Sequence, residues 1–302
     1  MKFAINPALL GFCLLSACSA AKESEASQDS AARSASSQQR SENAAEHIFQ
    51  VSVASSVQGV AIEKLTRLPK APASGDRTAC EGTWIKPQTR VGRQVAAAGW
   101  RVTGEARIGA YQAVSFAGDF NQGTSGSCDV RHGNVGFFRD DALVAIAYAP
   151  ASAQTTIGSF ESKGSESQRI RLWDGDISPR PIADVEVSSD GDIAVQPVAG
   201  QDKVCKGHAA VPNIFGQPIS QARAAVQSKG WQPIIQRADR DPELGVAERG
   251  YTDRFPEVES CAGTGFGYCN FEYRQAAGTL SVTTVGDGDD PTVSHYRVAC
   301  AE

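Results

Sequence analysis

The chain has 302 residues, with 29 Lys and Arg against 34 Asp and Glu, and a formal net charge of −5 at pH 7. This mild acidity, without a long basic run, argues against nucleic-acid binding, which normally needs a clustered basic face. The 255 residues that follow position 47 (302 − 47) are enough for two domains of ordinary size.

The first 17 residues have the organisation of a bacterial secretion signal. Lys2 supplies a positive charge, a mostly apolar stretch runs from Ile5 to Leu15, and small residues precede Cys18. The apolar stretch is shorter than the roughly 20 residues that span a bilayer, and no second run of spanning length follows. We therefore predict a signal peptide at 1–17 and a mature chain that is soluble apart from any anchor.

The run Leu15-Ser16-Ala17-Cys18 resembles the lipobox of bacterial lipoproteins. The resemblance implies a diacylglycerol on the sulfur of Cys18, cleavage before this residue and acylation of its new amino group, which together give a stable membrane anchor. Ser19 follows, not Asp. By resemblance to Gram-negative sorting rules, this implies export to the outer membrane and not retention at the inner one. We expect the folded part to face the periplasm, with the cell surface as the alternative. The alternative is an ordinary cleaved signal in which Cys18 is incidental.

Residues 18–47 form a segment of mainly Ser, Ala, Gln and Glu. Because it has almost no large apolar side chain, it cannot bury enough surface to offset the entropy lost on ordering. We predict that this segment is a disordered tether behind the lipid, with an r.m.s. reach of roughly 30 Å.

Two matching segments divide the rest of the chain. PQTRVGRQVAAAGW at 87–100 and PISQARAAVQSKGW at 218–231 both start with Pro, which suits a first helical turn, and both end in Gly-Trp. Gly99 and Gly230 stand where a helix needs a left-handed residue at its end. We predict a helix over each segment and infer that the domain is duplicated.

Strand patterns follow each predicted helix, after a Gly-rich loop that contains a Cys. The predicted strands have apolar residues in alternation or in short runs bounded by turns: 135–139, 143–148, 170–173, 184–187, 193–196, 269–273 and 280–284. We predict an α+β fold of two tandem modules, 48–200 with an extra hairpin and 201–302. Each module is expected to be one helix packed on a small antiparallel sheet.

The chain has eight cysteines, of which Cys13 leaves with the signal and Cys18 carries lipid. An even number in an oxidising compartment predicts three disulfides. The six candidates are Cys80, Cys128, Cys205, Cys261, Cys269 and Cys300. A metal site is the alternative, but the closest pair is wider apart than in a zinc knuckle and has no His nearby. We therefore predict no metal and no cofactor.

The pairing follows in part from the modules. Cys80 with Cys128 is the sole pairing within the first module. In the second module the repeat would match Cys205 with Cys261, which leaves Cys269 with Cys300. These last two would lie at opposite ends of an up-down-up meander, too far apart for a disulfide. We therefore favour pairing Cys261 with Cys269 and Cys205 with Cys300.

The sequence gives only weak signals for catalytic residues. The loop at 123–127 nearly matches G-x-S-x-G around Ser125 but ends in Ser and precedes a strand, so the nucleophile elbow is absent. His132 is close in sequence, without a third, orienting group. The acidic run at 286–290 could bind Ca²⁺ but lacks the EF-hand order, and a solvated turn explains it better. The same explanation covers the run at 174–176.

Trp100 and Trp231 could be platforms for a ligand. Their matched positions, directly after the two predicted helix ends, favour a structural role in the core between helix and sheet. We therefore assign Gly99 and Gly230 as helix caps and the two tryptophans as core residues.

The run V-P-N-I-F-G at 211–216, followed by the predicted helix and Gly230, resembles the opening of a PASTA domain. In that family a three-stranded sheet packs on the helix, and its members occur in cell-wall-sensing kinases and penicillin-binding proteins. The resemblance implies contact with peptidoglycan or its precursors, and it covers no catalytic residue. The chain departs from the family in Trp231, in a long insertion at 236–256 and in a Cys-rich loop.

We expect a non-enzymatic cell-envelope lipoprotein that binds peptidoglycan or another envelope component and is held to the membrane by its lipid. The alternative is a periplasmic protein–protein interaction factor or inhibitor that acts through disulfide-stiffened loops at 123–128 and 261–269. A hydrolase that uses Ser125 or His132 is a third possibility.

Overall fold

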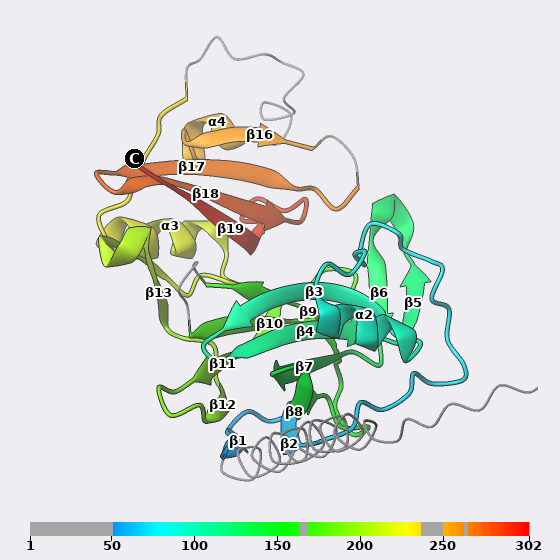
Figure 1. Ribbon diagram of the computed structural model, residues 1–302. Helices are drawn as coiled ribbons and strands as arrows, with labels where there is room; N and C mark the ends of the chain where they lie inside the picture. The colour runs from blue at the N-terminus through cyan, green and yellow to red at the C-terminus, as the bar shows by residue number, and fades with distance from the viewer. Residues whose placement is uncertain (1–50, 164–167, 237–249, 263–264, 302) are drawn as a thin grey trace, which may run out of the picture. The chain divides into compact units, whose positions relative to one another are not determined.

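The computed structural model describes residues 51–163, 168–236, 250–262 and 265–301 (Figure 1). From Val51 onward the chain forms one compact unit. The predicted signal peptide, Cys18 and the predicted tether lie outside the described residues. No helix in the described part of the chain is long and apolar enough to cross a bilayer.

One five-stranded antiparallel sheet carries the first helix (Figure 1). Its order is β2-β8-β7-β4-β3. Its strands are β2 (Ala61–Lys64), β3 (Arg101–Ile108), β4 (Tyr111–Ala117), β7 (Asn134–Arg139) and β8 (Ala142–Tyr148). Helix α2 (Arg90–Ala97) buries Val91 and Val95 against Val102 and Phe116 of this sheet. The hydroxyl of Thr89 accepts the Gly92 N–H and begins the helix.

A second five-stranded sheet lies against the first. Its order is β1-β12-β11-β10-β9, with β1 and β12 parallel and the other pairs antiparallel. Its strands are β1 (Val53–Ser55), β9 (Ile157–Ser162), β10 (Arg169–Asp174), β11 (Pro181–Val187) and β12 (Ile193–Gln196). The Tyr111 hydroxyl of the first sheet donates to the Gly191 carbonyl before β12, at 2.5 Å. Strands β4 and β8, which are interior strands of the first sheet, are buried at nearly every position.

Two short hairpins extend from these sheets. The first joins β5 (Asp119–Gln122) to β6 (Cys128–Arg131) through the single 3-10 turn η1 (Thr124–Gly126). The second joins β13 (Gln201–Val204) to β14 (Ala209–Pro212) through η2 (Cys205–Gly207). Both hairpins contain a cysteine, so each can be fixed to a distant part of the chain.

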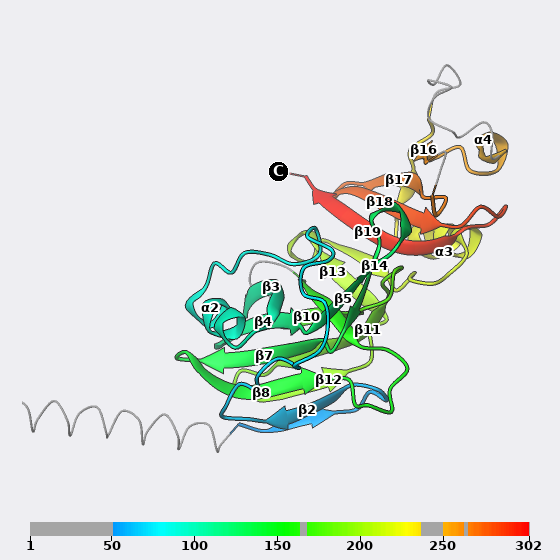
Figure 2. The same cartoon turned by 90° about the vertical axis from the view of Figure 1, so that its right-hand side faces the viewer.

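The C-terminal sheet packs on the second long helix (Figure 2). Its order is β15-β17-β18-β19, and β16 also pairs with β17. The elements are α3 (Ile219–Ser228), β15 (Gln232–Pro233), α4 (Tyr251–Arg254), β16 (Val258–Cys261), β17 (Cys269–Gln275), β18 (Gly278–Val285) and β19 (Thr292–Cys300). Helix α3 places Ile219, Ala222 and Val226 in the core of this sheet.

The two Gly-Trp pairs end their helices in the same way. Gly99 has a φ of +94° and Gly230 a φ of +88°, the left-handed conformation that glycine adopts at low cost. The following Trp100 and Trp231 are buried, and the indole N–H of each donates to a backbone carbonyl at 2.8 Å. Beyond the tryptophans the topologies differ, because β3 pairs with its neighbour β4 whereas β15 pairs with β17.

The prediction of an α+β fold built from helix-on-sheet modules is wrong. Strand is far commoner than helix among the described residues, with elements β1 to β19, and only α2 and α3 are longer than about one helical turn. Several strands were not predicted because polar and apolar residues do not alternate along them. Strand β4, for example, is covered on both faces, so it does not need such a pattern. The domain boundary at 200/201 stays a prediction.

Candidate functional site

A cleft of about 900 Å³ opens where the second sheet meets the start of the C-terminal region. Its lining comes from β6, the segment before β9, the end of β10, the start of β11, the loop after β14 and the start of β19. This volume is in the range of small-molecule and cofactor sites. We take this cleft as the candidate site because it gathers charged, amide, hydroxyl and aromatic groups in one place.

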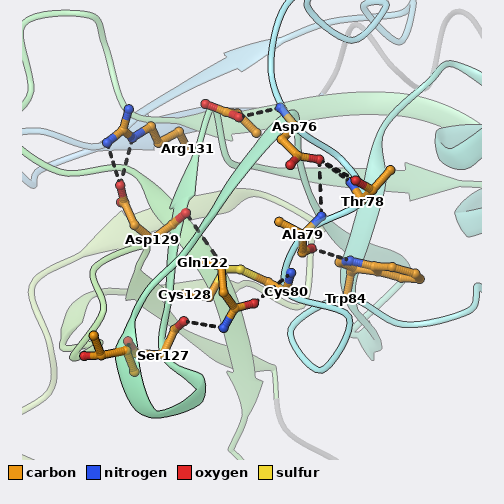
Figure 3. The surroundings of a disulfide bond; sticks show 12 residues. Asp76, Thr78, Ala79, Cys80, Trp84, Gln122, Ser127, Cys128, Asp129 and Arg131 are labelled. Carbon is orange, nitrogen blue, oxygen red and sulfur yellow. Dashed lines mark hydrogen bonds and ion pairs between the residues drawn. A yellow bond between two sulfur atoms is a disulfide. The ribbon is translucent and has the colours of Figure 1, made fainter.

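One wall of the cleft is the β5–β6 hairpin, which the Cys80–Cys128 disulfide fixes to the loop before α2 (Figure 3). Directly after Cys128, Asp129 and Arg131 line the cleft and pair with each other, at 2.7 Å between Arg131 Nη2 and Asp129 Oδ2. The Val130 N–H between them donates to the Gly175 carbonyl at 2.7 Å. This bond ties the hairpin to the end of β10.

The floor of the cleft contains Asp174, the last residue of β10, which is only 3% exposed. One oxygen of its carboxylate accepts the Arg180 N–H at 2.8 Å. The Arg180 side chain is mostly exposed, and its Nε is 3.8 Å from the other oxygen. Burial raises the pKa of Asp174 above its ordinary value, and the charge of Asp176 adds to the rise; backbone N–H groups and Arg180 oppose it.

A second wall of the cleft comes from the segment that resembles the PASTA opening. Asn213, Phe215 and Gly216 line the cleft, and the Gly216 N–H bonds the Val293 carbonyl of β19 at 2.9 Å. The Phe215 ring packs edge-on against Trp173, with centroids 5.3 Å apart. The Oδ1 atom of Asn213 is buried without a hydrogen-bond partner. The wall therefore offers a free acceptor beside a fixed aromatic ring.

A buried ion cluster supports this floor. Arg171 of β10 is 1% exposed and bonds Asp184 of β11 at 2.8 Å and Asp202 of β13 at 2.7 Å. The Tyr296 hydroxyl of β19 also donates to the carboxylate of Asp202. Burial works to raise the pKa of Asp202, but the hydrogen bonds and positive charge of Arg171 outweigh it and hold that pKa below its ordinary value. The cluster therefore joins three segments far apart in sequence.

The prediction of three disulfides is confirmed. Cys80 pairs with Cys128, and Cys205 pairs with Cys300. Cys261 pairs with its neighbour Cys269 across the β16–β17 ladder, with Cα atoms 4.0 Å apart. These are the pairs that the meander geometry favours, not the pairs that the repeat suggests.

The other sequence candidates lie in different places. Ser125 is in η1 and His132 is an exposed residue in the turn after β6. In the acidic run at 286–290, Asp290 accepts the Ser220 N–H at 2.9 Å, so it caps the start of α3. Within the described residues, no group of three or more His, Cys, Asp and Glu could hold a metal ion.

Asp174 is the residue that sequence reasoning missed. Its run, Asp174-Gly175-Asp176, has the composition of a solvated turn. The available signal was its position at the end of the predicted strand at 170–173, which places the first Asp of the turn in the sheet.

No family model matches the chain, and neither does any curated protein or solved structure.

Proposed function

We propose that this chain is a non-enzymatic, lipid-anchored outer-membrane lipoprotein that faces the periplasm and binds peptidoglycan in the cleft. The anchor is inferred from the lipobox at Leu15–Cys18. One observation carries the binding proposal: the segment at 211–216, which resembles the PASTA opening, provides Asn213, Phe215 and Gly216 to the cleft wall.

The chemistry of the lining supports the same ligand class. A glycan with peptide side chains presents hydroxyl, amide and charged groups, and the cleft offers matching carboxylates, guanidinium groups, two amides and hydroxyls. The three acidic residues of the lining outnumber its two arginines, so the cleft does not suit a polyanion. This balance also disfavours nucleic acid as the ligand.

The test is co-sedimentation with purified sacculi, using the full mature chain with Cys18→Ser so that lipid does not drive sedimentation. Gln154 is an exposed residue on the cleft lining, and Gln154→Trp should fill the entrance without disturbing the core. Ser152→Trp is the matched control, because Ser152 is exposed on the same loop but does not line the cleft.

We expect the chain and the control to sediment and Gln154→Trp to lose about tenfold or more in affinity, the equivalent of about 1.4 kcal/mol. A chain that stays in the supernatant at every sacculus concentration would rule out peptidoglycan as the ligand.

The alternative function is a periplasmic protein–protein interaction factor or inhibitor. A specific observation favours it: the loop closed by the Cys261–Cys269 disulfide presents Tyr268, which is 37% exposed, with the Phe266 ring 6.1 Å away. Aromatic side chains on a stiff loop are common in protein interfaces. A stoichiometric periplasmic partner that is lost on Tyr268→Ser but retained by Gln154→Trp would favour this function.

A further inference from the structure

We propose that Asp174 makes the cleft selective for ligands that carry a primary ammonium group. In peptidoglycan, this group is the free amine of a diamino acid in the stem peptide. The inference rests on the proposed function and specifies which part of the polymer the cleft recognises.

The first argument is the distribution of charge in the cleft. Asp129 and Arg131 neutralise each other through contacts of 2.7 and 2.8 Å. The remaining ionisable groups are Asp174, Asp176 and Arg180, with a net charge of −1 (two acids against one base). Because the Arg180 side chain is mostly exposed, it screens this charge poorly. The cleft therefore has one negative charge that no positive charge of the lining balances.

The second argument is the way in which Asp174 is held. Its close partners are the backbone N–H groups of Arg180 and Asp176, which carry no net charge. The nearest cation is 3.8 Å away, too far for a good hydrogen bond. By contrast, the neighbouring buried carboxylates Asp184 and Asp202 each have an arginine within 2.8 Å.

A buried carboxylate without a close cation is costly unless a partner arrives. In the core, Asp184 and Asp202 have their cation within the chain. Asp174 lines the cleft, so a ligand can reach it. Its missing partner is therefore expected to come from outside the chain.

The third argument identifies the donor. Asn213 also lines the cleft, and its buried Oδ1 atom is an acceptor without a hydrogen-bond partner. An ammonium group has three donors and no acceptor, so it can bond Asp174 and still offer donors to other oxygens of the lining. A carboxylate or phosphate has only acceptors and would be repelled by Asp174. The free acceptors and the negative charge thus favour the same group.

The experiment compares untreated sacculi with sacculi whose free amines have been acetylated. Both are tested with the Cys18→Ser chain, with Asp174→Asn and with Asp176→Asn. Asn can keep the oxygen that accepts the Arg180 N–H, while the other carboxylate oxygen becomes an NH2 group and the negative charge is removed. Asp176 is exposed at the rim, so its variant is the matched control for a lost negative charge.

We expect acetylation to weaken binding of the parent chain and of Asp176→Asn by about tenfold or more, the effect of losing a charge-assisted hydrogen bond. Asp174→Asn should bind both preparations equally and weakly. Equal binding of the parent chain to both preparations would overturn the selectivity and leave the proposed function intact. No binding to either preparation would instead reject the proposed function. If Asp174→Asn still bound untreated sacculi more tightly than acetylated sacculi, another group would be the one that recognises the amine, and the proposal would be wrong.

Discussion

Replacement of Arg171 by Met should be among the most destabilising single substitutions in the chain. The side chain is 1% exposed and bonds two buried carboxylates, Asp184 at 2.8 Å and Asp202 at 2.7 Å. Met fills a similar volume but removes the buried guanidinium that bonds both carboxylates, and it leaves Arg169, 3.3 Å from Asp184 and 2.7 Å from Asp202, as their remaining arginine. Breaking a buried ion pair by removing one partner costs about 3–5 kcal/mol. For a domain of this size, that cost lowers Tm by roughly 6–20 °C, at about 2–4 °C per kcal/mol.

Urea unfolding and thermal denaturation at neutral pH measure this loss. The control is Arg90→Met, because Arg90 forms an ion pair with Asp141 at 2.8 Å but is 73% exposed. Exposed pairs of this kind contribute about 0–1 kcal/mol. If Arg171→Met lowered the free energy of unfolding no more than Arg90→Met does, the idea that the cluster excludes water and is tightly paired would be refuted.

The pH dependence of the same cluster follows from Asp202, whose pKa in the folded chain is held below its ordinary value of 3.8. Its stabilising contribution is therefore fully present above pH 3.8 and is lost as pH falls through the lower, folded value. The advantage of the parent chain over Arg171→Met should shrink over that acid range.

Two further predictions concern the C-terminal region. Asp290→Ala removes the cap from α3 and should cost about 1 kcal/mol in urea unfolding, whereas a cost near zero would mean that the acidic turn is only solvated. Replacing Cys205 and Cys300 by Ala should cost roughly 4–5 kcal/mol, against roughly 2–3 kcal/mol for Cys261 and Cys269, because the sequence separations are 95 and 8 residues. Equal losses for the two pairs would contradict this loop-length argument.

Local signals in the sequence were enough to predict several elements. The β7–β8 hairpin turns at Asp140 and Asp141, which both have positive φ, as a tight two-residue turn requires. The two Gly-Trp helix ends follow from the need for a left-handed residue. Each of these features depends on a few neighbouring residues, so a single sequence can predict it.

Strands of the second sheet were predicted at 170–173, 184–187 and 193–196, but the way in which the sheet is completed could not be predicted in this way. Its edge pairs β1 with β12 in parallel, and Val53 meets Ile193 across 140 residues of chain. No local pattern encodes such a partner. The α+β prediction failed for this reason, because segments without a strand pattern of their own pair with distant strands and become part of a sheet.

The burial of Asp174 also depends on a distant contact. A Cβ added at Gly175 would lie 2.1 Å from the Val130 carbonyl oxygen, so only glycine allows β6 to approach this closely. The approach of β6 covers the end of β10 and contributes to the burial of the preceding carboxylate. A glycine between two aspartates also predicts a solvated turn, and the position of Asp174 at a strand end does not reveal that a distant strand covers it.

If Asp174 is kept for a ligand and not for stability, Asp174→Asn should leave the fold as stable as before or more stable at neutral pH. Burial raises the pKa of Asp174 above 3.8. Between 3.8 and that raised value the native chain holds a proton that the unfolded chain has lost, so the free energy of unfolding falls as pH rises through this range. The variant has no such charge to bury, and its stability relative to the parent should therefore improve from acid to neutral pH in urea unfolding. The opposite trend would make Asp174 a structural anchor of the kind that Asp202 is, and the ammonium proposal would lose its physical basis.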